Sequence, residues 1–290
     1  MSKARPSRRG MIAGAAASLV AGAAVAADAL STIEARVGGR LGVAAIDLGN
    51  GRKLAHRADE RFPMCSTSKA MAAAAALARV DAGAERLDRF VRYGEADLLE
   101  YAPTTRAHVA EGGLTLGALC EAAVELSDNT AANLILASIG GPAGWTAFVR
   151  RLGDGASRLD RNEPTLNTCI PGDPRDTATP WAMVGDLRQT LLGGALKPAS
   201  RERLQGWMVG CKTGLTQLRA GLPANWRIGD KTGNDGHTTT NDIAVAWTPT
   251  GPIVVVCYLT EAASVSGDAR QAAIADVGRL VAETFRPARG

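Results

Sequence analysis

The chain has 290 residues, of which 46% are hydrophobic and 21% charged, a composition that favours a folded globular protein and argues against a disordered one. The formal net charge is +4, but residues 1–27 carry four Lys or Arg and no acidic residue, so the rest of the chain is neutral overall. This balance excludes a broadly basic surface, and we expect no nucleic-acid partner.

The N-terminal segment 1–27 is typical of an export signal. The pair Arg8-Arg9 precedes an uncharged Ala/Gly-rich stretch from Met11 to Ala27, which fits a twin-arginine signal peptide that is removed to leave a periplasmic protein. A membrane anchor is the alternative, but the stretch is short and weakly hydrophobic. We therefore expect a mature monomer that has no membrane partner.

The segments that follow predict strands at both ends and helices between them. Two short apolar segments around Asn50-Gly51 predict a β-hairpin within residues 41–58. The middle of the chain predicts helices, of which the clearest are Met71–Val80, Leu116–Leu126 and Ala131–Ile139. The C-terminal part predicts three strands and a final amphipathic helix, over residues 226–228, 243–247, 253–259 and 269–285.

These elements predict an α/β protein with two lobes. The early hairpin and the three late strands are expected to share one antiparallel sheet flanked by helices, so that residues 28–62 and 210–290 form an α/β lobe built from both chain ends. Residues 63–209 would then form an all-helical lobe inserted between the two parts of the first lobe.

Prolines and polar residues dominate the segment that begins at Arg161, so we expect a long Ω-type loop over residues 161–176. Arg161 and Asp176 could pair to close this loop, or they could be two solvated surface charges. Inside it, Glu163 and Asn167 lie four residues apart. A carboxylate and an amide at that spacing could hold a water molecule, with the carboxylate as its general base.

Ser66 and Lys69 lie three residues apart at the start of the first predicted helix, and therefore on one helical face. A lysine amine within hydrogen-bond reach could accept the proton of a serine hydroxyl, while N–H groups at the helix N-terminus could bind a developing oxyanion. A helix start with a capping serine and a surface lysine gives the same pattern. The pair is a candidate for catalysis that needs support from other motifs.

The tripeptide Ser127-Asp128-Asn129 lies between two predicted helices. Its serine could join the chemistry of the site. Its Asp or Asn could also cap the second helix, and both interpretations can hold together.

The tripeptide Lys231-Thr232-Gly233 lies on an extended stretch between predicted strands, at an edge of the expected sheet. A fixed cation and a hydroxyl there suit a substrate carboxylate, and an edge strand can pair with a peptide-like amide. A second Lys-Thr-Gly begins at Lys212, but it follows a helical segment and leads into a turn. We therefore prefer the later copy.

The order of these four motifs along the chain resembles that of the class A serine β-lactamases. The resemblance covers essentially all of the chain after residue 27, and it includes Tyr101 and Pro103 ahead of Ser-Asp-Asn and Leu218-Arg219-Ala220 ahead of Lys-Thr-Gly. It implies an enzyme that opens the β-lactam ring of penicillin- and cephalosporin-type antibiotics through an acyl-enzyme and so confers resistance.

The resemblance also implies a role for each motif residue. Ser66 would be acylated, Lys69 and Ser127 would move protons, and Glu163 with Asn167 would position the deacylating water. The further substrate-binding residues would be Tyr101, Asn129, Lys231, Thr232, Gly233 and Asn234. The N–H groups of Ser66 and Asn234 would form the oxyanion hole, and either Lys69 or Glu163 could be the base for acylation.

Two positions depart from the family pattern. Many members supply an arginine near Lys-Thr-Gly to bind the substrate carboxylate; residues 237–240 lack one, so Arg270 is the remaining candidate. Cys65 matches a cysteine that carbapenem-hydrolysing members tie to one just after Lys-Thr-Gly, but residues 234–236 offer no partner. Carbapenem hydrolysis therefore does not follow, and the pairing of the five cysteines stays open.

Two other classes of protein share part of this pattern. Penicillin-binding transpeptidases and carboxypeptidases have the serine and lysine motifs but deacylate slowly, and Glu163 is the feature that distinguishes them. A non-catalytic β-lactam sensor would need a transmembrane segment and a cytoplasmic region, and we expect neither. No metal or cofactor is expected, because the three isolated histidines lack metal-ligand spacing.

Overall fold

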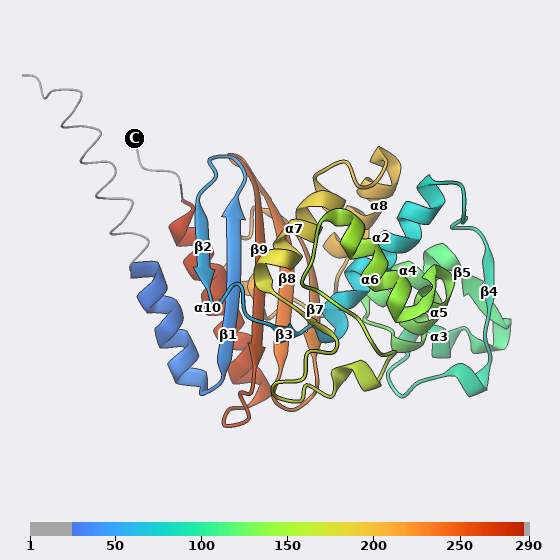
Figure 1. The fold of residues 1–290 in the computed structure, drawn as a ribbon, viewed down its shortest axis with the longest axis horizontal. Helices are drawn as coiled ribbons and strands as arrows, with labels where there is room; N and C mark the ends of the chain where they lie inside the picture. The colour runs from blue at the N-terminus through green and yellow to red at the C-terminus, as the bar shows by residue number, and fades with distance from the viewer. Residues whose placement is uncertain (1–24, 287–290) are drawn as a thin grey trace, which may run out of the picture.

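The computed structural model describes residues 25–286 (Figure 1). A five-stranded antiparallel sheet in the order β2-β1-β9-β8-β7 lies at its centre, which confirms the expected α/β class and the single sheet shared by both chain ends. Its strands are β1 (Arg40–Asp47), β2 (Lys53–His56), β7 (Arg227–Asn234), β8 (Thr240–Thr248) and β9 (Gly251–Thr260). Residues 1–24, most of the expected signal peptide, lie outside the described residues.

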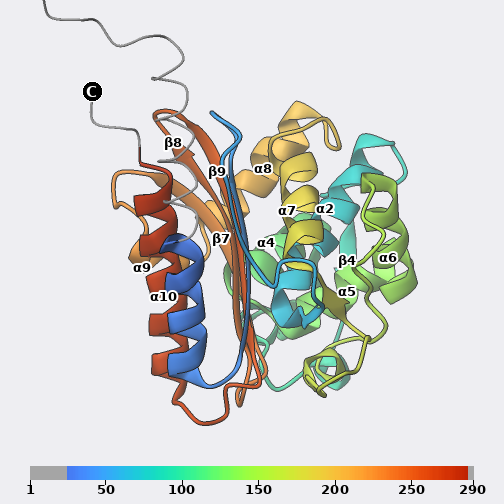
Figure 2. The same cartoon turned by 60° about the vertical axis from the view of Figure 1, so that its left-hand side comes forward.

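Helices cover both faces of the sheet. Figure 2 shows α10 and the helix over residues 25–37 against one face, while α2, α7 and α8 lie on the other side. The helices are α2 (Ser68–Asp81), α3 (Pro103–Ala107), α4 (Leu116–Glu125), α5 (Asn129–Ile139), α6 (Gly141–Leu152), α7 (Pro180–Leu191), α8 (Pro198–Val209), α9 (Leu218–Gly221) and α10 (Gly267–Thr284). Within residues 25–286 no one helix has the length and apolar character to cross a membrane, although α5 and α6 together, bent by 71°, do.

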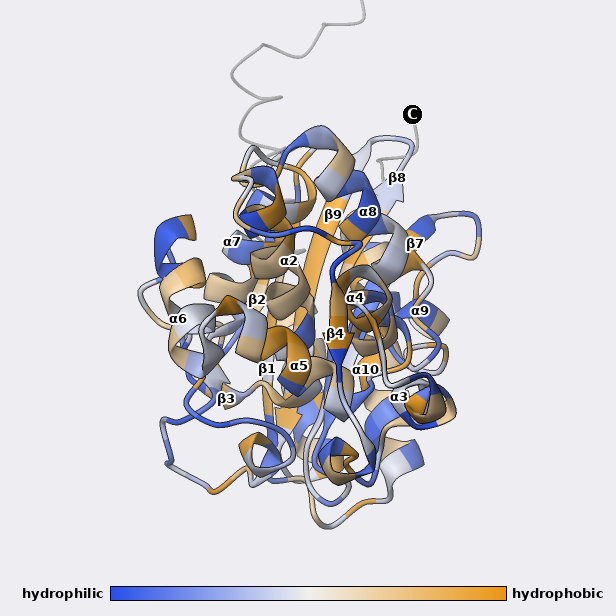
Figure 3. Ribbon diagram, turned by 90° about the vertical axis from the view of Figure 1, so that its right-hand side faces the viewer, coloured by the Kyte–Doolittle hydropathy of each residue, from blue (hydrophilic) through white to orange (hydrophobic). Residues whose placement is uncertain are grey.

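The sheet divides the hydrophobic core into two clusters because successive strand residues point to opposite faces. In β9, Val254, Val256 and Tyr258 pack with the helices of the larger cluster, whereas Val255 and Cys257 pack with α10 and its neighbours in the smaller one. Burial on both faces favours a continuously apolar strand, and Figure 3 shows β9 as largely hydrophobic, in agreement with its central residues Ile253 to Cys257.

Local details differ from the sequence predictions at element ends. Asn50 and Gly51 lie in a longer connection between β1 and β2, where the Asp47 carboxylate accepts hydrogen bonds from Gly49 N and Asn50 Nδ2. The helix expected from Met71 begins at Ser68, and the strand expected to precede Lys-Thr-Gly contains it.

Two short strand pairs tie loops to this framework. β3 (Phe62–Pro63) pairs with β6 (Thr177–Ala178), and β4 (Phe90–Arg92) pairs with β5 (Gly113–Thr115). The first pair matters for the site, because β3 leads into Ser66 while β6 follows the long loop. The segment before the serine and the end of the loop are therefore held side by side.

Candidate active site

Ser66 lies in a single 3-10 turn, η1 (Cys65–Thr67), directly before α2. Cys65 has a φ of 47°, in the left-handed region that few non-glycine residues occupy. One helical turn later, the buried side chain of Lys69 returns to the serine, and its Nζ donates a hydrogen bond to Ser66 Oγ at 2.7 Å. The spacing of three residues therefore brings the two groups into contact.

Polar groups from three segments surround the Lys69 amine. Its Nζ lies 2.6 Å from Asn129 Oδ1, 2.9 Å from Ser127 O and 2.9 Å from Glu163 Oε1. Burial lowers the pKa of Lys69, because it removes water from the ammonium, while the charges of Glu163 and Asp128 oppose that shift. The net lowering favours the neutral amine that could accept a proton.

Glu163 reaches the serine from the long loop. Its Oε1 lies 3.3 Å from Ser66 Oγ, and its Oε2 accepts a hydrogen bond from Asn167 Nδ2 at 2.5 Å. The Oδ1 atom of Asn167 is buried and has no hydrogen-bond partner among the described residues, so it can accept a bond from a bound water. The carboxylate and amide therefore offer a water site beside the serine.

Two contacts hold this loop in place. Arg161 and Asp176 form the ion pair that was one of the two interpretations of these charges, with Nε 2.5 Å from Oδ2. Asn133 on α5, which the sequence analysis missed, donates to Glu163 O and accepts from Glu163 N, both at 2.9 Å. The backbone of the loop carboxylate is thus fixed from the helical side.

Ser127, Asp128 and Asn129 connect α4 to α5 and do two things at once. The Asp128 carboxylate caps α5 by accepting from Ala131 N at 2.8 Å, as the capping interpretation expected. Ser127 has a φ of 60°, and its Oγ lies 3.3 Å from Lys69 Nζ. The cap therefore fixes a turn that directs a hydroxyl and an amide at the lysine.

The strand β7 forms the opposite wall, at the edge of the sheet. Lys231 is fully buried, its Nζ donates to Ser127 Oγ at 3.0 Å, and burial lowers its pKa to about 8. Gly233 passes so close to the serine turn that a Cβ would lie 3.0 Å from Ser66 N. The missing side chain keeps that N–H, the expected oxyanion donor, uncovered.

These groups open into one cleft of about 830 Å³. Of the residues predicted from the sequence, it is lined by Ser66, Tyr101, Ser127, Asn129, Asn167, Thr232 and Asn234, whereas Lys69, Glu163, Lys231 and Gly233 lie buried beneath its floor. The exposed Tyr101 stands at the rim, and its carbonyl accepts from Asn129 N at 3.0 Å.

The cleft is also lined by polar residues to which the sequence analysis gave no role, among them Thr213, Gln217 and Gln271. Thr213 belongs to the copy of Lys-Thr-Gly that was set aside. Its Oγ1 lies 2.6 Å from Thr232 Oγ1, so the two copies of the motif meet in space. The repeated tripeptide was the signal that could have found it.

Arg270 does not reach the cleft, which corrects the role expected for it. Its guanidinium is buried and donates to Ala262 O, Val265 O and Thr240 Oγ1, at 3.2, 2.7 and 3.2 Å. The next residue on α10, Gln271, lines the cleft instead. Adjacent residues on a helix point about 100° apart, so a shift of one position removes the side chain from the site.

A serine hydroxyl between a buried lysine and a buried carboxylate, below a cleft bounded by a sheet edge, defines a serine hydrolase. A model of the β-lactamase enzyme family matches residues 25–285. β-Lactamase AST-1 of Nocardia asteroides is 45% identical over 262 residues, which are 90% of this chain and 84% of that protein. β-Lactamase CTX-M-8 of Citrobacter amalonaticus is 47% identical over 258 residues, 88% of each chain.

Comparison with solved structures points to the same family as these relatives. An ancestral (GNCA) class A β-lactamase is similar with a TM-score of 0.87 and 61% identity, covering 90% of this chain and 100% of its own. The chain therefore belongs to the class A β-lactamase family.

Proposed function

We propose that this protein hydrolyses the β-lactam ring of penicillin- and cephalosporin-type antibiotics through an acyl-enzyme on Ser66, and thereby confers resistance. The observation that supports this best is the position of Ser66 Oγ, 2.7 Å from Lys69 Nζ and 3.3 Å from Glu163 Oε1. A second base beside the nucleophile suits an enzyme that removes its acyl group, whereas a penicillin-binding protein retains it.

In the acylation step, the neutral Lys69 amine accepts the Ser66 proton as Oγ attacks the carbonyl carbon of the ring. The carbonyl oxygen becomes an oxyanion that the N–H groups of Ser66 and Asn234 bind. As the carbon–nitrogen bond breaks, the ring nitrogen takes a proton from Ser127, which Lys69 then reprotonates. The contacts of Lys69 Nζ with both hydroxyls support this route.

In the deacylation step, Glu163 accepts a proton from a water that Asn167 helps to hold, and the hydroxide attacks the ester carbon. The ester bond to Ser66 breaks, the serine recovers a proton, and the ring-opened acid leaves. General-base assistance of this kind is worth about 10²–10⁴-fold in rate.

We assign substrate binding to residues on the two walls of the cleft. We assign the substrate carboxylate to Lys231 and Thr232, with Thr213 added through its contact with Thr232. Asn129 and Tyr101 also line the cleft, and we assign contact with the substrate side chain to them. Arg270 has no part in this assignment because its guanidinium is used by backbone carbonyls.

Replacing Glu163 by Gln tests the proposal. Residues 28–290 should hydrolyse a chromogenic cephalosporin, and Ser66→Ala should abolish turnover. Glu163→Gln should still acylate, so mass spectrometry should detect the ester on Ser66 while steady-state turnover falls by about 10²–10⁴-fold.

Glu111→Gln, an exposed change of the same type, is the control and should turn over normally. Rapid turnover by Glu163→Gln would refute its role in deacylation. A stable ester on the unmodified enzyme would instead favour a penicillin-binding protein.

We also propose that the protein is exported to the periplasm by the twin-arginine route and acts there as a monomer. Changing Arg8 and Arg9 to Lys should retain uncleaved chain, and its activity, in the cytoplasm; normal periplasmic activity would argue against this route. The lobe boundaries near residues 62 and 210 are part of the same proposal. They are supported by the location of α2 through α8 between these positions.

A further inference from the structure

Two thiols meet directly behind the nucleophile. Cys65, the residue before Ser66, has its Sγ 3.4 Å from the Sγ of Cys169, which lies two residues after Asn167 in the long loop. All five cysteines are free thiols, and within residues 25–286 no other two thiols are in hydrogen-bond contact. The partner that residues 234–236 could not offer therefore comes from the loop.

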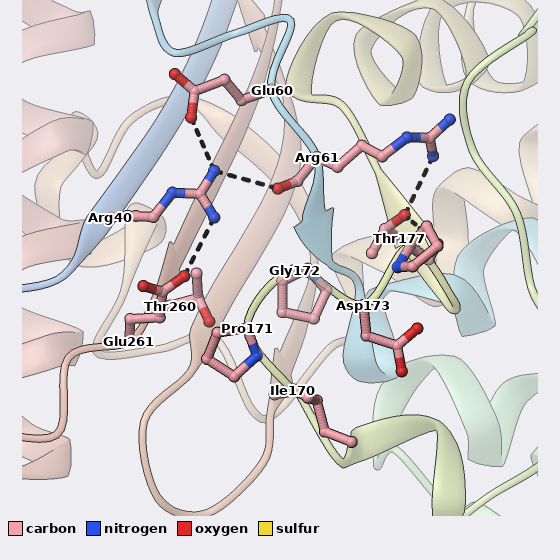
Figure 4. A pocket seen from close by; sticks show the side chains of 13 residues that line it. Arg40, Glu60, Arg61, Ile170, Pro171, Gly172, Asp173, Thr177, Thr260 and Glu261 are labelled. Atoms are coloured by element: carbon pink, nitrogen blue, oxygen red, sulfur yellow. Dashed lines mark hydrogen bonds and ion pairs between the residues drawn. The ribbon is translucent and has the colours of Figure 1, made fainter.

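The two thiols differ in access. Cys65 is fully buried, whereas Cys169 is partly exposed and lines a separate cavity of about 360 Å³ that shares no lining residue with the cleft. Figure 4 shows Ile170 and Pro171 on one wall of this cavity and Arg40 and Arg61 on another. A small molecule can therefore reach Cys169 without entering the active-site cleft.

The two thiols also differ in acidity. A hydrogen bond from the Cys65 thiol lowers the pKa of Cys169, whereas the same contact and complete burial raise the pKa of Cys65 well above its usual value. The thiolate is the form that attacks a disulfide. Access and acidity thus select the same residue, Cys169, to react first.

We propose that Cys65 and Cys169 are a disulfide-forming pair, oxidised by thiol–disulfide exchange with an external disulfide that enters through the Cys169 cavity. The Cys169 thiolate attacks one sulfur of that disulfide, releases the other as a thiolate, and becomes a mixed disulfide. Cys65 then loses its proton and attacks Cys169 Sγ, which releases the second thiolate. The protein loses two electrons and two protons, and the external disulfide becomes two thiols.

This bond would connect the residue before the nucleophile to the loop that carries the deacylation residues. The two cysteines are 104 positions apart, so the cross-link closes a long loop and restricts the unfolded chain strongly. The expected consequence is a melting temperature about 5–10 °C higher for the oxidised enzyme than for the reduced one.

Thiol counting with oxidised glutathione as the probe tests the proposal. After exposure, denatured enzyme should retain three of its five thiols, its mass should fall by two hydrogens, and peptide mapping should join Cys65 to Cys169. Cys65→Ser should stop at the mixed disulfide and carry one glutathione on Cys169, whereas Cys169→Ser should stay unmodified. Cys120→Ala, the matched control at a separate buried cysteine, should lose two thiols like the unmodified enzyme.

Several results would overturn the proposal. Five thiols remaining after exposure would show that the pair does not oxidise. A disulfide mapped between other cysteines would show that Cys65 and Cys169 are not the reactive pair. Glutathione on Cys65 in the Cys169→Ser variant would reverse the order of attack. Melting temperature gives an independent measurement, because the difference between oxidised and reduced enzyme should disappear in Cys169→Ser.

Discussion

Lys69 and Lys231 are both buried, and both contact the hydroxyl of Ser127. Burial lowers the pKa of each, but the proposed chemistry needs opposite forms of them. Lys69 must be neutral to accept a proton, whereas Lys231 must be charged to bind a carboxylate. The proposed acylation therefore requires Lys69 to lose its proton while Lys231 keeps its own.

The pH dependence of kcat/KM should reveal the titration of Lys231. Its pKa of about 8 belongs to the free enzyme, so the ammonium is present below pH 8 and is lost as pH rises above it. For substrates that carry a carboxylate, kcat/KM should fall by about tenfold per pH unit above that value. Steady-state kinetics from pH 6 to pH 10 measure this directly.

Lys231→Arg is the matched variant, since a guanidinium stays charged throughout this range. Whatever the value of kcat/KM for this variant at pH 7, it should not decrease as pH rises above 8. A flat profile for the unmodified enzyme up to pH 10 would contradict the assignment.

At the residue scale, the sequence predicted which side chains come together wherever a short motif fixes their spacing. Ser66 and Lys69 meet because three residues make nearly one helical turn. Thr213 and Gln271 were missed because their place in the cleft depends on how elements distant in sequence pack around the sheet. Arg270 was expected at the cleft but does not line it, because the sequence does not reveal which side of α10 faces the cleft.

Among the elements, the start of α5 does the most for the site. The Asp128 carboxylate is fully buried and accepts hydrogen bonds from Ala131 N, Thr104 N, and both N and Oγ1 of Thr105. It therefore joins α5 to α3 while it holds the turn that presents Ser127. One side chain thus couples a helix cap to the geometry of the site.

Asp128→Ala should destabilise the protein by about 2–4 kcal/mol, because it removes a helix cap and leaves buried N–H groups without acceptors. Urea unfolding monitored by circular dichroism measures the loss. Thr179→Ala removes the N-cap of α7, whose single hydrogen bond runs from Ala182 N to Thr179 Oγ1, and should cost only about 1 kcal/mol. Equal losses for the two variants would contradict the special role of Asp128.

Element types were easier to predict than element ends. The helices and strands named from the sequence all occur, because long apolar periodicity survives tertiary packing. The strand before Lys-Thr-Gly proved longer than expected because pairing with β8 carries polar residues such as Asp230 and Lys231 into the sheet. A segment with such polar residues is not recognised as a strand from the sequence alone, because its pairing with β8 is not known at that stage.

At the scale of the whole molecule, a buried pair of acids lies in the helical part, away from the cleft. Burial raises the pKa of Asp186 to about 9, and nearby Asp154 adds to the shift. Asp154 Oδ2 and Asp186 Oδ2 have no hydrogen-bond partner among the described residues. Asp186 is therefore protonated in the folded protein at neutral pH but ionised when the chain unfolds.

Stability should consequently fall as pH rises from about 4 to about 9, because over this range the unfolded chain binds fewer protons at Asp186 than the folded one. Asp186→Asn cannot ionise, so its melting temperature should vary less with pH and should exceed that of the unmodified enzyme at pH 9. Calorimetry at pH 5, 7 and 9 measures both curves. Asp88→Asn changes an exposed residue and should leave the pH dependence of the melting temperature unchanged. If Asp186→Asn also left it unchanged, that result would contradict the explanation.

The pairing of β1 with β9 over eight residues has a consequence for synthesis of the protein. A nascent chain that ends before Gly251 has β1, β2, β7, β8 and the helices from α2 to α9, but it lacks α10 and has no strand to place between β1 and β8. Because β9 lies between β1 and β8, these strands can join into one sheet only after residues 251–260 have been synthesised. A shorter translation product lacks the strand that connects the N-terminal strands to β8 and β7.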